Sequence, residues 1–178
     1  MIEPLTRKRP AAQPRTNEGE APTAYVFQDV LEEIRFNGGY SPRQIAGGLL
    51  FGRHFKCDEW GSSYVEVAGF VAATHCGDVP GFINHFRTQW KSAGATLRYQ
   101  FPDDEVVGWF LAAPEGFTPE STEQMDQDVY LLHSTFLQQP WQVGLWVQGK
   151  ESPPLALSRM SGRLHSIEAA LVRRIPTP

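Results

Sequence analysis

Few cysteines, no long apolar run and no excess of positive charge limit what this 178-residue chain can be. Two cysteines do not make a disulfide framework. No run approaches the roughly 18 apolar residues that a membrane helix needs, and the N-terminus lacks the apolar core of a secretory signal. With 16 Lys and Arg against 20 Asp and Glu, the chain has no cationic footprint for nucleic acid. These absences predict a cytoplasmic protein with no membrane span and no nucleic-acid partner.

The apolar content is sufficient for one folded domain. Hydrophobic residues make up 41% of the chain and charged residues 20%, which excludes a wholly disordered protein. Residues 1–24 lack an apolar period and indicate a flexible N-terminal arm, in which nearby glutamates almost balance the basic cluster Arg7 to Arg9. We therefore predict this arm, a folded domain over 25–158, and a C-terminal helix and tail over 159–178.

The spacing of apolar residues predicts alternating helices and strands after the arm. Val26, Val30 and Ile34 recur at helical spacing, and the Asn-Gly-Gly run at 37–39 would end that helix. Trp109 and Trp146 are predicted core residues on two strands. The remaining predictions are a hairpin over 45–73, helices over 86–99 and 121–136, strands over 105–111 and 141–148, an edge strand over 155–159 and a last helix from Met160. This order predicts a single α/β or α+β domain with a curved mixed sheet flanked by helices.

Polar residues with reactive side chains are sparse. His75, Cys76, Asp78 and His85 lie within eleven residues and could ligate a metal or supply a Cys–His nucleophile, but no CxxC or HExxH spacing supports a site. Polar loop residues are the favoured interpretation. His133 lies beside Leu132 on a predicted helix, so a partly buried histidine with a hydrogen-bond partner is favoured over a catalytic one.

Several motifs in one order point to a known family. They are GGLLFG at 47–52, VVGWF with a following proline at 106–114, HSTFLQQPWQVGLWV at 133–147, and Trp90 twelve residues before Pro102. Over Tyr25 to Gly149 the chain resembles the bacterial MPN domain family, also called JAMM or JAB. The resemblance implies a single MPN-like domain.

The same resemblance implies an inactive member. Active members bind zinc through the two histidines of an HxHP segment and an aspartate on the next helix, with a glutamate as general base. Those four positions here hold, in that order, Leu111, Ala113, Gln124 and Ile45. Counting from the PWQV segment instead moves the aspartate position to Val129, beside Asp128. Leu and Ala offer no lone pair to a metal, so we expect no zinc, no cofactor and no catalytic residue.

Silent MPN domains commonly act as partners, so the resemblance implies a scaffold or adaptor subunit that binds protein. The candidate contact is the 4-3-4 stripe of Met160, Leu164, Ile167 and Leu171, which could instead pack on its own domain. Expected partners are an MPN-family protein, a protein of a ubiquitin-like system, or a second copy. Two alternatives remain: binding of a ubiquitin-like protein or peptide in the former substrate groove (Trp109, Pro114 and Ser121), and hydrolysis at a non-standard site near His75 and Cys76.

Overall fold

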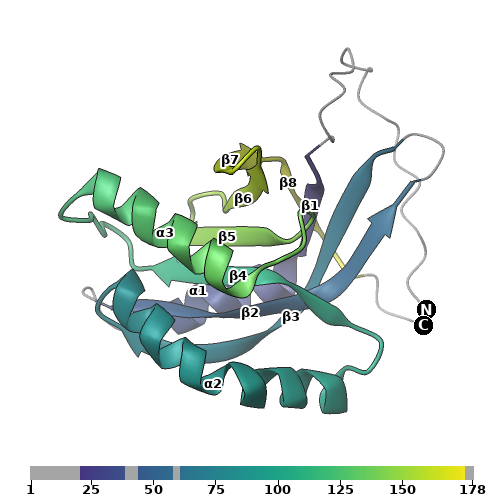
Figure 1. Ribbon diagram of the computed structural model, residues 1–178, viewed down its shortest axis with the longest axis horizontal. Helices are drawn as coiled ribbons and strands as arrows, with labels where there is room; N and C mark the ends of the chain where they lie inside the picture. Colours follow the sequence, from purple (N-terminus) through teal and green to yellow (C-terminus); the bar gives the residue numbers. More distant parts are fainter. Residues whose placement is uncertain (1–20, 39–43, 58–60, 175–178) are drawn as a thin grey trace.

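One eight-stranded mixed sheet forms the centre of the chain in this computed structural model, which describes residues 21–38, 44–57 and 61–174. The strands are β1 (Thr23–Phe27), β2 (Ile45–Lys56), β3 (Ser63–Cys76), β4 (Glu105–Ala113), β5 (Val143–Gln148), β6 (Leu155–Met160), β7 (Arg163–Ile167) and β8 (Ala169–Val172). The helices are α1 (Gln28–Gly38), α2 (Val79–Gln100) and α3 (Thr122–Phe136). The predicted α+β class and the curved sheet flanked by helices are confirmed (Figure 1).

The sheet runs in the order β7-β6-β5-β4-β2-β3-β1-β8. β2 pairs antiparallel with both β3 and β4, so the predicted hairpin is present and its first strand is central. β5 pairs parallel with β4, and β5, β6 and β7 form an antiparallel series. β1 pairs parallel with β3 and with β8. The apolar first run of the hairpin therefore lacks alternation because both of its faces are covered.

Helices cover both faces of the sheet. α1 packs its buried side chains, Val30, Leu31 and Ile34, into one apolar cluster with strand residues such as Leu50 and Phe110. α2 and α3 cover the opposite face, where the second cluster contains their own apolar side chains together with those of β2, β4 and β5 (Figure 1). Alternate residues along each central strand therefore enter different layers of the core.

The predicted first helix begins too early. Residues from Thr23 to Phe27 form β1, and α1 starts only at Gln28. β1 lies between β3 and β8 and hydrogen-bonds to both, while Val26 and Phe27 are buried. Val26 and Phe27 thus fitted the apolar spacing of the helix although they belong to the strand. A buried strand and the buried face of a helix both carry apolar side chains, so spacing alone does not separate them.

α2 is longer than its apolar spacing predicts. It begins at Val79 rather than near Phe86, because Asp78 caps it by accepting a hydrogen bond from the Gly81 amide at 2.7 Å. A proline in the first turn suits the helix start, since its missing N–H has no intrahelical partner there. Most of the segment 75–81, between the predicted hairpin and helix, therefore belongs to the end of β3 and the start of α2.

The predicted C-terminal helix is wrong. The residues of its stripe belong to three strands: Met160 ends β6, Leu164 and Ile167 lie on β7, and Leu171 lies on β8. Ser161 and Gly162, with φ values of 49° and 76°, turn the chain between β6 and β7. Positive φ at both central residues is typical of a tight hairpin turn, so a 4-3-4 spacing interrupted by this turn cannot continue as a helix. β6 also has neighbours on both sides, so it is not the predicted edge strand.

One residue, Glu168, separates β7 from β8, although these strands stand at opposite ends of the sheet order. β7 pairs with β6, while β8 pairs with β1, and the Ala24 amide donates to the Glu168 carbonyl at 2.9 Å. The two ends of the sheet therefore approach each other, which accounts for its strong curvature.

Candidate functional site

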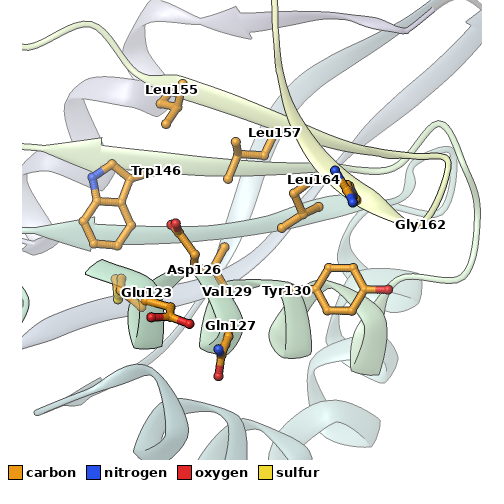
Figure 2. Close-up of a pocket in the computed structure, with 12 residues that line it drawn as sticks. Glu123, Asp126, Gln127, Val129, Tyr130, Trp146, Leu155, Leu157, Gly162 and Leu164 are labelled. Atoms are coloured by element: carbon orange, nitrogen blue, oxygen red, sulfur yellow. The ribbon is translucent and has the colours of Figure 1, made fainter. Parts of the chain in front are cut away.

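A groove of about 800 Å³ lies between α3 and the strands β5, β6 and β7 (Figure 2). α3 contributes Glu123, Met125, Asp126, Gln127, Val129 and Tyr130, and the strand side contributes Trp146, Leu155, Leu157, Gly162, Arg163 and Leu164. Most of the lining is therefore apolar, with charged groups at both walls. A groove of this size and composition suits the burial of large apolar side chains from a ligand.

α3 is fixed at its start by Ser121, whose hydroxyl accepts a hydrogen bond from the Gln124 amide at 3.2 Å. Serine is one of the residues favoured at a helix N-cap. Its buried face consists of Val129, Leu132, His133 and Phe136, which pack toward the sheet. With that face turned toward the sheet, Glu123 and Asp126 lie at the groove. Asp126 projects from the helix toward the strands (Figure 2).

Trp146 forms the aromatic part of the strand wall. Its indole projects from β5 toward α3 (Figure 2), and its ring lies 6.1 Å from that of Phe117. Trp146 is half-buried rather than fully buried, so the prediction of a core residue is confirmed for Trp109 only. In the β4–β5 register Trp146 pairs with Leu111, which places the groove beside the strand that carries two of the positions matched to zinc ligands.

The four positions matched to the zinc site do not form a polar cluster. Ile45, Leu111 and Ala113 are buried in the same apolar cluster, on the neighbouring strands β2 and β4. Gln124 is exposed on α3 and donates from its amide nitrogen to Asp128 at 2.9 Å. In the alternative register, Val129 is buried in that cluster and cannot ligate a metal either.

These residues do not fit zinc. Three buried aliphatic side chains occupy the matched positions, and a cation placed among them would lose its hydration without gaining a ligand. Within the described ranges no group of three or more His, Cys, Asp or Glu side chains is close enough to hold a metal ion.

The former groove residues are not accessible as a set. Trp109 and Pro114 are buried, and Ser121 is occupied as the cap of α3. The partner stripe is also dispersed: Leu164 lines the groove, Ile167 packs against the cluster on the other face of the sheet, and Leu171 is exposed on β8. The predicted contact residues therefore lie on separate parts of the fold, whereas the groove is lined by residues of α3, β5, β6 and β7.

His133 is buried more deeply than predicted. It is 1% exposed, and its Nδ1 accepts a hydrogen bond from Trp109 Nε1 at 3.3 Å. Burial, with a smaller contribution from the nearby charge of Arg159, lowers the pKa of His133 to about 4. His133 is thus neutral at physiological pH, with its proton on Nε2, and ties α3 to β4.

The candidate cluster near residue 75 is divided. Asp78 caps α2 and His85 lies within that helix, while the side chains of His75 and Cys76 lie outside the described part of the chain. The basic cluster Arg7 to Arg9 also lies outside it.

Comparison with known proteins gives the fold and no family. No family model and no curated protein match the chain. The solution structure of protein DSY2949 from Desulfitobacterium hafniense is similar, with a TM-score of 0.57 over 86% of this chain and 95% of that chain. The two sequences are 14% identical, so the similarity shows a shared fold alone. Among the described helices, none has the length and apolar content to cross a bilayer.

Proposed function

We propose that this chain is a non-catalytic, MPN-like protein that acts in the cytoplasm as a scaffold or adaptor subunit. It binds a protein partner through the groove between α3 and the β5–β7 strands. The observation that carries this proposal is the groove itself, an apolar channel of about 800 Å³ with half-buried aromatic and leucine side chains. Contiguous apolar surface of this kind commonly marks a binding site.

Support for the lack of catalysis comes from the residues beside the groove. Leu111 and Ala113 stand where the family resemblance requires zinc ligands, and both side chains are buried among other apolar groups. Neither residue can donate a lone pair to a metal or move a proton. A member with these residues keeps the scaffold while losing the zinc-dependent chemistry.

Support for protein binding comes from the exposed lining. Leu155 is 44% exposed and Tyr130 is 39% exposed, and the half-buried Trp146 packs against the core while it lines the groove. Tyrosine and tryptophan are the residues most often found as interface anchors. A ubiquitin-like protein or peptide is the second candidate partner, because the register of Trp146 with Leu111 brings the groove next to the former site.

Site-specific photo-crosslinking in the native cell tests the proposal. A photoreactive phenylalanine analogue replaces Tyr130 in the groove or, as the matched control, Tyr99, which is 90% exposed on α2. We expect a discrete protein adduct from the groove position and not from the control. No adduct at Tyr130, or the same adduct at both positions, would overturn the proposed binding role. Stoichiometric zinc or isopeptidase turnover in the purified chain would overturn the proposed absence of catalysis.

A further inference from the structure

Acidic side chains dominate the segment that builds the helical side of the groove. Between Arg98 and Lys150 the sequence contains no Lys or Arg and eight acidic residues: Asp103, Asp104, Glu105, Glu115, Glu120, Glu123, Asp126 and Asp128. The charged residues of α3 are therefore all acidic, since its single histidine, His133, is neutral. The helical wall of the groove has a negative potential that favours a cationic ligand.

Two of these carboxylates lie at the groove and are available to a ligand. Glu123 and Asp126 line it and are exposed, and neither forms an ion pair within the described residues. Arg163 is the basic residue of the lining, and it lies on the opposite wall at the start of β7. The groove is therefore acidic along α3, apolar between its walls and basic at one point of the hairpin.

Apolar contact and charge define one type of ligand. The side chains of Trp146, Leu155 and Leu157 offer apolar surface to a large aliphatic or aromatic group. A Lys or Arg next to that group would reach Glu123 or Asp126 without burial of an unpaired charge. An acidic residue in the same place would be repelled.

We propose that the groove binds a segment of a partner protein in which a large apolar side chain is flanked by Lys or Arg. This inference rests on the proposed protein-binding function and specifies the chemistry of the partner. The acidic wall selects the basic residue, and the apolar lining supplies most of the contact area.

Short fluorescein-labelled peptides with blocked ends test this chemistry on the full chain by fluorescence anisotropy. The first probe is Gly-Ser-Leu-Arg-Leu-Arg-Ser-Gly, and matched probes carry Glu or Gln in place of Arg. We expect the Arg probe to bind more tightly than the Gln probe and the Gln probe more tightly than the Glu probe. The preference for Arg should weaken as salt is raised, because salt screens exposed charges.

Variants of the chain assign the preference to the groove. Combining Glu123→Gln with Asp126→Asn should weaken the Arg probe about tenfold, which is the sum of two exposed ion pairs. Arg163→Gln removes a repulsive charge and should tighten the same probe about threefold. The matched control is Asp103→Asn, which removes an exposed carboxylate in the turn between α2 and β4 and should change nothing.

The apolar contact has its own matched pair. Leu155→Asn should abolish binding of the Arg probe, whereas Leu171→Asn should leave it unchanged, since both side chains are 44% exposed but only Leu155 lines the groove. Equal affinity for the Arg and Glu probes would overturn the inference, as would an affinity insensitive to the two carboxylates. Self-association that Leu155→Asn disrupts would show a second copy in the groove and would also overturn it.

Failure of this inference is distinguishable from failure of the proposed function. If Tyr130 crosslinks a partner whose contacting segment carries no Lys or Arg, the binding role stands and the chemistry assigned to the segment is wrong.

Discussion

His133 should make the stability of this protein fall sharply on acidification. The unfolded chain takes up a proton at this residue near the ordinary pKa of 6.5, whereas the folded chain does so only near about 4. Between these values the unfolded state binds more protons, so stability is full above the unfolded pKa and is lost as the pH decreases toward the folded pKa. From about pH 7.5 to about pH 4.5 the loss attributable to His133 is about 2.5 kcal/mol, at about 1.4 kcal/mol for each pKa unit.

The assay is urea unfolding at both pH values, followed by tryptophan fluorescence, in the wild type and in His133→Gln. Glutamine retains an oxygen that can accept the hydrogen bond from Trp109 but does not titrate. The variant should be less sensitive to acid than the wild type by about 2.5 kcal/mol, whatever the variant's own stability at neutral pH. Subtracting the two proteins cancels other titrating groups, such as Glu66 and His54. An identical acid response in both proteins would refute the placement of His133 as a buried neutral residue.

Four further predictions concern packing and helix stability and can be measured by the same unfolding assay. Leu132→Ala should cost about 2–5 kcal/mol because the side chain is fully buried, whereas the neighbouring Leu131, 52% exposed, should tolerate alanine at a cost below about 0.5 kcal/mol. Gly144→Ala should destabilise by about 1–3 kcal/mol, since the new methyl group would lie 2.2 Å from a buried indole carbon. Gly94→Ala should instead stabilise by about 1 kcal/mol, because nothing lies within 4 Å and alanine favours the helix. Gln142→Met should cost about 3 kcal/mol, as it leaves two backbone amides and one carbonyl without the partner they have now. Reversed signs for the two glycine variants, or a neutral Gln142→Met, would contradict the packing described.

Local signals in the sequence predict most of the helices and central strands. The bounds of α3 are predicted to within one residue, because the cap at Ser121 and the apolar period from Val129 to Phe136 agree. The same reasoning does not predict β1, because the apolar side chains of Val26 and Phe27 fit the helical period of α1 and were assigned to that helix. The cap at Asp78 was available in the sequence and would have placed the start of α2 correctly.

The C-terminal strands show where apolar spacing fails. Met160 and Leu164 are four residues apart, which suits a helix, but the Ser-Gly pair between them forms the hairpin turn. β8 hydrogen-bonds to β1, which lies far away in the sequence, and no local pattern contains that information. A Ser-Gly pair between apolar runs was the signal that favoured a hairpin.

The groove could not be predicted for the same reason. Asp126, Trp146, Leu155 and Arg163 come from four elements, and only the order of strands brings them to one place. The burial of Ile45, Leu111 and Ala113, the positions matched to the zinc site of the MPN family, was easier to predict because these residues belong to strongly apolar strands. Sequence reasoning therefore located the apolar interior of the domain and missed the surface beside it.

Because Glu168 joins the two outermost strands of the sheet, loss of the residues from β7 onward would affect both of its sides. Premature termination of translation before β7 would remove the nine strand residues of β7 and β8, and would leave β6 and β1 each without one of its two neighbours. Strands with unpaired backbone N–H and C=O groups readily pair with strands of other polypeptides, which leads to aggregation. A shortened product would therefore precipitate rather than persist as a slightly weakened monomer, and cellular quality control would encounter it as an aggregate.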